Sequence, residues 1–190
     1  MCRRQNKTHC RSSLETSNIT YWTIRLMHDN PLLPLIGNPY KLLKAARLEE
    51  GQKVVEVGCG PGFFTIPAAR IVGDEGHVYA VDLHPRAVKR VEEKIEKKTL
   101  ENVTPICTNA SNTGLPDRSV DLSFLFGLRY IAGGLENVLF EMHRILKPEG
   151  ILSFEKTRGS ERELIEEVER GGFIYSGRQG RVFSFTKKGE

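Results

Sequence analysis

Long apolar runs are missing from this sequence of 190 residues. The longest candidate, residues 31–36, falls far short of the roughly 18 residues that a membrane-spanning helix needs. Residues 1–18 are polar and basic and lack the apolar stretch of a secretion signal. These absences predict a cytoplasmic protein with no membrane partner. The four cysteines include no Cys-x-x-Cys pair, so no zinc or other metal site is predicted.

A strong charge of one sign is also missing outside the N-terminus. The formal net charge is +4, and residues 1–30 contribute five basic against two acidic residues. The remaining residues are nearly neutral, so a nucleic-acid partner is not expected. We predict a basic tail over residues 1–38, in which Tyr21 and Trp22 suit either a lid or a hydrophobic anchor. Residues 39–190 are predicted to form one domain, and the sequence indicates no oligomeric state.

Short apolar segments alternate with amphipathic ones along that domain. Strands are predicted at residues 53–57, 77–81, 103–107, 120–125, 151–155, 173–175 and 182–186. Helices are predicted at residues 38–51, 63–72, 85–98 and 134–147, and around residues 164–168. This alternation indicates an α/β fold with a mostly parallel sheet covered on both faces. Pro105 places the third strand at an edge, and the short link between the last two strands makes them antiparallel.

The sharpest motif joins the first strand to the next helix. Gly58, Gly60 and Gly62 stand at alternate positions, where glycine lets the backbone turn tightly and approach a ligand. Asp82 ends the second strand, 20 residues after Gly62, where a carboxylate can accept both hydroxyls of a ribose. Phe63 replaces the small residue of a dinucleotide fingerprint. The pattern predicts a nucleoside site; the alternative is a packing turn with Asp82 as a helix cap.

These residues resemble the class I S-adenosylmethionine-dependent methyltransferases, and most of all the branch of the ubiquinone and menaquinone C-methyltransferases. The likeness covers about residues 40–187, including Glu56 to Gly62, Val81-Asp82, Leu115 to Asp121 and Arg144 to Gly150. It implies a Rossmann-like, doubly wound, seven-stranded sheet with an antiparallel terminal strand, and S-adenosylmethionine as cofactor, with S-adenosylhomocysteine as product.

The same resemblance implies the cofactor-binding residues. Five belong to the first motif and would wrap the methionine part: Glu56, Gly58, Cys59, Gly60 and Gly62. Asp82 would hold the ribose. Leu83, Asn109 and Ala110 would lie beside the adenine, with the Asn109 carbonyl replacing the more usual aspartate, and Phe126 would line the pocket.

The implied activity is methyl transfer to a small-molecule acceptor, because no substrate domain is inserted between the core elements. Two alternatives stay open: transfer to protein or RNA, suggested by the basic tail, and an inactive cofactor-binding partner protein. No catalytic base is assigned. Tyr130, Arg129, Glu155 and His28 are candidates by position only.

Overall fold

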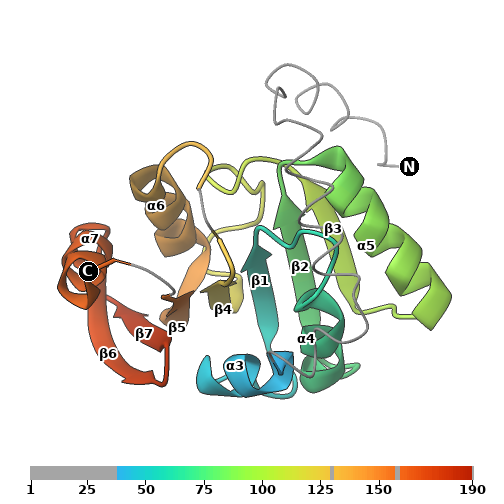
Figure 1. Cartoon of the computed structure of the whole chain (residues 1–190), viewed down its shortest axis with the longest axis horizontal. Coiled ribbons are helices and arrows are strands. Elements are labelled where there is room, and N and C mark those ends of the chain that lie inside the picture. Colours follow the sequence, from blue (N-terminus) through green and yellow to red (C-terminus); the bar gives the residue numbers. More distant parts are fainter. Residues whose placement is uncertain (1–37, 129–130, 157–158, 190) are drawn as a thin grey trace.

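A seven-stranded sheet in the order β3-β2-β1-β4-β5-β7-β6 forms the centre of the computed structural model (Figure 1). The structure describes residues 38–128, 131–156 and 159–189. The strands are β1 (Lys53–Val57), β2 (His77–Asp82), β3 (Val103–Cys107), β4 (Val120–Leu125), β5 (Leu146–Glu155), β6 (Phe173–Gln179) and β7 (Val182–Lys187). The helices are α3 (Pro39–Ala45), α4 (Thr65–Val72), α5 (Pro85–Lys98), α6 (Leu135–Ile145) and α7 (Glu161–Arg170).

The pairing confirms the predicted sheet. Strands β1 to β5 pair in parallel, and β7 pairs antiparallel with both β5 and β6. β3, which contains Pro105, is an edge strand as predicted. Among the described residues, no helix combines the length and the apolar character needed to cross a membrane.

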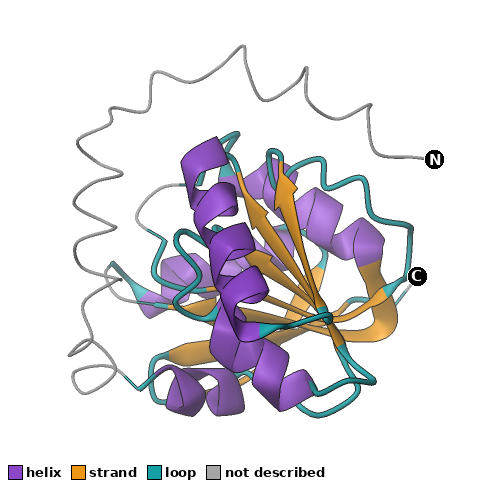
Figure 2. Cartoon of the chain, turned by 90° about the vertical axis from the view of Figure 1, so that its right-hand side faces the viewer, coloured by secondary structure: helices purple, strands orange, loops and turns teal. Residues whose placement is uncertain are grey.

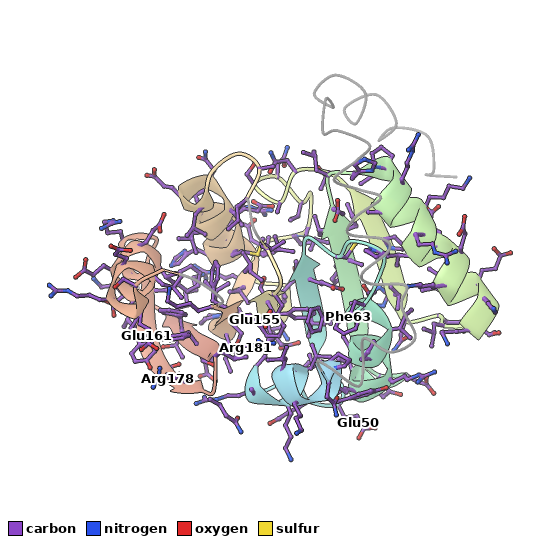
Figure 3. The ribbon with its side chains drawn as sticks, in the orientation of Figure 1. Glu50, Phe63, Glu155, Glu161, Arg178 and Arg181 are labelled. Atoms are coloured by element: carbon purple, nitrogen blue, oxygen red, sulfur yellow. The ribbon has the colours of Figure 1, made fainter. Side chains whose placement is uncertain are left out.

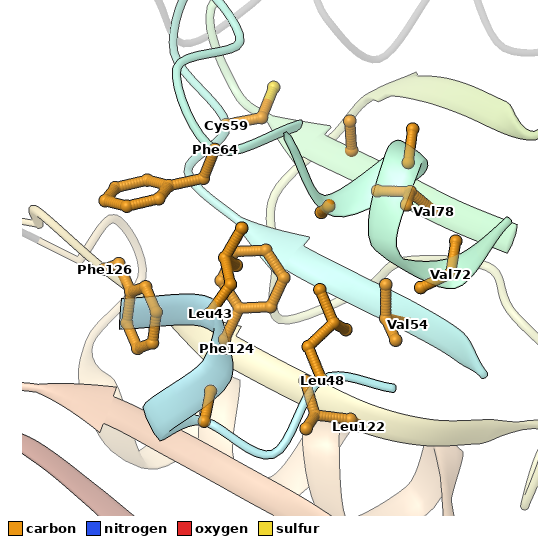
Figure 4. Close-up of a cluster of buried hydrophobic side chains, with 14 of the residues drawn as sticks. Leu43, Leu48, Val54, Cys59, Phe64, Val72, Val78, Leu122, Phe124 and Phe126 are labelled. Carbon is orange, nitrogen blue, oxygen red and sulfur yellow. The ribbon is translucent and has the colours of Figure 1, made fainter. Parts of the chain in front are cut away.

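Helices cover both faces of the sheet (Figure 2). Successive residues of β1 point to opposite faces, so Val54 joins one core and Val55 the other. The first core packs α3, α4 and α5 against β1, β2 and β4, with Leu43, Phe64 and Phe124 among its buried side chains (Figure 4). The second packs α6 and α7 against the other face. The two cores fix the strand ends from which the site is built.

The first helix is shorter than predicted. α3 ends at Ala45, not at Gly51, because Arg47 adopts a left-handed backbone with φ of 64°. The Leu48 N–H then donates to the Leu43 carbonyl, which closes the helix end. This turn carries Leu48 into the core.

The segment after α6 also differs from the prediction. The helix stops at Ile145 and β5 begins at once with Leu146, so Pro148 lies inside a strand. Pairing with β4 skips from Leu146 to Ile151, and pairing with β7 begins only at Ile151. Pro148 therefore lies in an unpaired bulge, where its missing N–H costs no ladder bond.

Two smaller boundaries also differ. α4 begins at Thr65, two residues later than predicted, because the glycine loop continues through Phe64. β6 extends to Gln179, so the link to β7 is a tight turn at Gly180 and Arg181, shorter than the predicted link over residues 176–181. The expected basic tail of residues 1–38, with Tyr21 and Trp22, lies outside the described residues except for Asn38, which caps α3 by accepting from the Tyr40 N–H.

Candidate functional site

The glycine loop lies against the carboxyl end of β2. Gly58, Gly60 and Gly62 have φ of 73°, 51° and 84°, a left-handed backbone that favours glycine. The N–H groups of Gly58 and Cys59 both donate to the carbonyl of Val81, at 2.8 and 3.0 Å. The neighbouring strand thus holds the loop through two backbone hydrogen bonds.

Asp82 connects this loop to the start of α5. Its Oδ2 accepts from the Gly60 N–H at 2.9 Å and its Oδ1 from the His84 N–H at 2.8 Å. Burial raises the pKa of Asp82, and these two backbone hydrogen bonds partly oppose the rise. A carboxylate offers about four acceptor directions, so two remain available to a ligand.

Asp82 does not cap helix α5, which was the alternative role for this residue. The cap of α5 is His84, whose Nδ1 accepts from the Arg86 N–H at 3.2 Å. Asp82 instead faces a pocket of about 150 Å³ at the carboxyl ends of β1 and β2. The pocket is lined by Val57, Gly58, Val81, Asp82, Leu83, Thr108, Asn109, Ala110, Leu128, Ile131 and Ala132.

Half of the predicted cofactor-binding residues meet in this pocket. They are Gly58, Asp82, Leu83, Asn109 and Ala110. The other five are not among its lining residues: Glu56, Cys59, Gly60, Gly62 and Phe126. Gly60 still touches the site, because its N–H fixes Asp82.

Glu56 lies beneath the glycine loop. Its side chain is buried, and its Oε2 accepts from the Thr65 hydroxyl at 2.5 Å. Burial raises the pKa of Glu56 to about 8, with a further contribution from the charge of Asp82, while the Thr65 bond opposes the rise. Glu56 therefore ties β1 to the first residue of α4 across the loop.

Cys59 and Phe126 belong to the first core (Figure 4). Burial, followed by the charges of Glu56 and Asp82, raises the pKa of the Cys59 thiol well above its usual range, so the thiol stays protonated. The Phe126 ring lies 5.4 Å from that of Phe64 and 5.1 Å from that of Phe124. Cys59 therefore anchors the glycine loop in this core, and Phe126 anchors the segment after β4.

Asn109 lies in a tight turn at the opposite wall. Its side-chain Oδ1 accepts from the Ser111 N–H at 3.0 Å, and its backbone carbonyl accepts from the Asn112 N–H at 2.9 Å. One acceptor direction of Oδ1 is thus occupied and a second remains for a ligand. Gly133 lies so close that a Cβ there would be 2.9 Å from the Asn109 amide nitrogen.

Glu155, a candidate base by position only, has both carboxylate oxygens engaged. Oε2 accepts from the Gly127 N–H at 2.9 Å, and Oε1 pairs with Arg181 Nε at 2.8 Å (Figure 3). Glu155 therefore holds the loop after β4 rather than standing free as a base. His28, Arg129 and Tyr130 lie outside the described residues. No group of three or more His, Cys, Asp or Glu in the described ranges is arranged to hold a metal ion.

Sequence reasoning missed the apolar wall after β4. Leu128 fills the space beside Gly58, where a Cβ would lie 2.3 Å from its Cδ2, and Ile131 and Ala132 extend the wall. Glycine at position 58 is thus needed for both its backbone and its missing side chain. The sequence gives only a weak signal for this contact, a leucine shortly after a buried strand.

Comparisons with known proteins identify the family. A family model described as "Methyltransferase domain" matches residues 54–150. Demethylmenaquinone methyltransferases from Geobacillus stearothermophilus and Listeria welshimeri are each 38% identical, over 111 and 112 residues. Each alignment covers 58% of this chain and 47% of the relative, so the chain spans about half the length of these curated relatives.

A solved structure agrees with these matches. The crystal structure of a SAM-dependent methyltransferase from Aquifex aeolicus superposes with a TM-score of 0.76 at 27% identity. The superposition covers 88% of this chain and 97% of the other. The family match, the relatives and this neighbour confirm the resemblance to the class I S-adenosylmethionine-dependent methyltransferases. The chain therefore belongs to the methyltransferase domain family.

Proposed function

We propose that this chain binds S-adenosylmethionine in the pocket beside Asp82 and transfers its methyl group to a small-molecule acceptor. The observation that carries the proposal is the placement of Asp82, whose carboxylate faces the pocket while the Gly60 and His84 N–H groups hold it. Because both bonds come from the chain's own backbone, they orient the carboxylate and reduce the binding energy needed to order it.

The residues present fit an adenosyl cofactor. Among the described residues, apart from the chain neighbours of Gly60, no atom lies within 4 Å of a Cβ placed at Gly60, and no side chain caps the start of α4. The glycine loop would lie along the methionine part, Asp82 would accept from the ribose hydroxyls, and Leu83, Asn109 and Ala110 would flank the adenine. When bound, the cofactor supplies an electrophilic methyl group on a sulfonium.

The chain's own contribution is positioning and exclusion of water. Leu128 and Ile131 give the pocket an apolar wall, and the Glu155 contact to Gly127 holds the loop that carries Leu128. Such orientation of two reactants is the main source of acceleration when the cofactor carries the reactive centre. No described residue has to act as a base if the acceptor reaches the site without a proton to lose.

Two features support a small-molecule acceptor. The curated relatives are demethylmenaquinone methyltransferases, and the described domain has no insertion large enough to form a separate substrate domain. The near-neutral net charge of residues 31–190 agrees with such an acceptor, because dedicated nucleic-acid binders are usually basic.

Methyl transfer from labelled S-adenosylmethionine tests the proposal. The chain is incubated with separate metabolite, protein and RNA pools, beside Asp82→Asn and an exposed control, Asp74→Asn. We expect label in the metabolite pool with the wild type and the control. Asp82→Asn loses charge-assisted bonds to the ribose, each worth about 1.5–3 kcal/mol, so its activity at low cofactor should fall at least about tenfold.

Label in protein or RNA alone would move the assignment to a macromolecular acceptor. Cofactor binding without transfer to any pool would favour a partner protein that has lost catalysis. Equal activity of Asp82→Asn and the wild type would remove the ribose role of Asp82.

A further inference from the structure

A buried carboxylate on α6 holds the segment between β3 and β4. Glu141 is 5% exposed, and its Oε1 accepts from both the N–H and the hydroxyl of Thr113, at 2.8 and 2.5 Å. Thr113 is itself 5% exposed. The hydroxyl of Thr113 also accepts from the Leu115 N–H at 3.2 Å, so the contact fixes the backbone on both sides of Thr113.

Arg144, one turn further along α6, completes the network. Its Nε donates to Glu141 Oε2 and its Nη2 to Oε1, each at 2.8 Å. Nη2 also donates to the Leu115 carbonyl at 2.8 Å, and Nη1 pairs with Asp117. The charge of Glu141 is therefore neutralised inside the protein. Burial alone would raise the pKa of Glu141, but the bonds from Arg144 and Thr113 outweigh it and the pKa is lowered.

The segment held in this way carries one wall of the pocket. Thr108, Asn109 and Ala110 line the pocket, and Asn109 is four residues before Thr113. The turn between them is closed by the Thr108 hydroxyl, which donates to the Asn112 carbonyl at 3.0 Å. The Asn112 N–H also donates to the backbone carbonyl of Asn109, so these bonds link the position of Asn109 to that of Thr113.

Helix α6 also holds a second neighbour of Asn109, Gly133. Gly133, two residues before α6, packs against the Asn109 amide, and its carbonyl accepts from Asn137 Nδ2 at 2.8 Å. Asn137 lies in the first turn of α6. Asn109 is thus constrained in two ways, directly by Gly133 in the turn before α6 and indirectly by Glu141, which holds Thr113.

We propose that Glu141 is a positioning residue for cofactor selection: through Thr113 and Arg144 it fixes the turn that presents Asn109 to the adenine. The inference rests on the proposed function, because it assumes an adenosyl ligand in this pocket. In this proposal Arg144 neutralises Glu141 and holds the Leu115 carbonyl; in the sequence, Arg144 stood out only as part of the family-like segment from Arg144 to Gly150. Loss of Glu141 would leave Asn109 present but variable in position.

The test compares two ligands that differ only at the adenine edge. Calorimetry measures Kd for S-adenosylhomocysteine and for S-inosylhomocysteine, in which an oxygen replaces the amino group. In the wild type, Asn109 Oδ1 can accept from the adenine amino group, which the inosyl ligand lacks. We therefore expect Kd for the adenosyl ligand to be about tenfold lower, the effect of one hydrogen bond. A general loss of stability would change both Kd values together and leave their ratio unchanged.

Three variants and one control are measured below their unfolding temperatures. Thr113→Val keeps the side-chain shape but removes the hydroxyl, and Glu141→Ala removes the acceptor; both should reduce the ratio to about threefold or less. Glu141→Gln keeps a carbonyl oxygen for Thr113 and should retain most of the ratio. Glu136→Ala removes an exposed carboxylate from the first turn of the same helix and should leave the ratio unchanged.

An unchanged ratio in folded Thr113→Val would overturn the positioning role, as would a wild type that binds both ligands equally. If Glu141→Ala does not fold, the comparison rests on Thr113→Val and Glu141→Gln. Failure of the wild type to bind S-adenosylhomocysteine is a different result, and it would contradict the proposed function itself.

Discussion

Glu56 shows how one buried residue links the site to stability. Its carboxyl group lies under the glycine loop, bonded to Thr65 and close to Asp82. Charging it in this place means moving a carboxylate out of water with one hydroxyl as its partner. The folded protein therefore keeps a proton on Glu56 at pH values where the unfolded chain releases it.

This difference predicts that stability falls as the pH rises. Between the ordinary pKa of 4.5 and the folded value of about 8, the folded state binds more protons than the unfolded state. The contribution of Glu56 is complete below pH 4.5 and is lost as the pH passes 8. We expect the free energy of unfolding in urea to decrease by a few kcal/mol between pH 5 and pH 9.

Glu56→Gln should flatten this decrease, because the amide has no proton to lose. Glu92→Gln, on the exposed side of α5, serves as the matched control and should keep the wild-type slope. An identical pH dependence in the wild type and Glu56→Gln would show that Glu56 ionises normally in the folded protein.

At the scale of elements, Asn102 joins the edge strand to the helix beside it. Its Nδ2 donates to the carbonyls of Ala69 and Gly73, each at 2.8 Å, at the end of α4. The last carbonyls of a helix have no partner within it, so a side chain from outside can satisfy them. This contact fixes the C-terminal end of α4, the helix that begins directly after the glycine loop.

Asn102→Ala should therefore destabilise the fold by about 1–2 kcal/mol, the cost of losing bonds to partly buried acceptors. Thermal unfolding measures the loss, and Glu101→Ala, at the exposed neighbouring position, is the control. Since Asn102 is remote from the pocket, affinity for S-adenosylhomocysteine should stay close to that of the wild type. A melting temperature equal to that of the control would mean that water replaces the amide without cost.

At the scale of the whole molecule, the parts of the fold that depend on local pattern could be predicted from the sequence. Alternating strands and helices, the edge position of β3 and the antiparallel ending all follow from residue spacing and from Pro105. The glycine loop and Asp82 could be predicted because each stands at a strand end. Pro148 misled the prediction of β5, because a bulge made by pairing with distant strands lets a proline lie within a strand.

Contacts between distant residues account for what the sequence did not reveal. Leu128 beside Gly58, Glu141 beside Thr113 and Glu155 beside Gly127 join residues at least 28 positions apart. Nothing in the local pattern distinguishes Glu141 from the exposed acids of other helices. Only its register on α6, facing the segment after β3, makes it part of the site's support.

The most direct test of the account is a calorimetric titration of the wild-type chain with S-adenosylhomocysteine and, separately, with a nicotinamide dinucleotide. The position of Asp82 and the replacement of a small residue by Phe63 predict binding of the sulfur nucleoside at one site per chain, with Kd in about the micromolar range, and no binding of the dinucleotide. Binding of the dinucleotide without the sulfur nucleoside would contradict it.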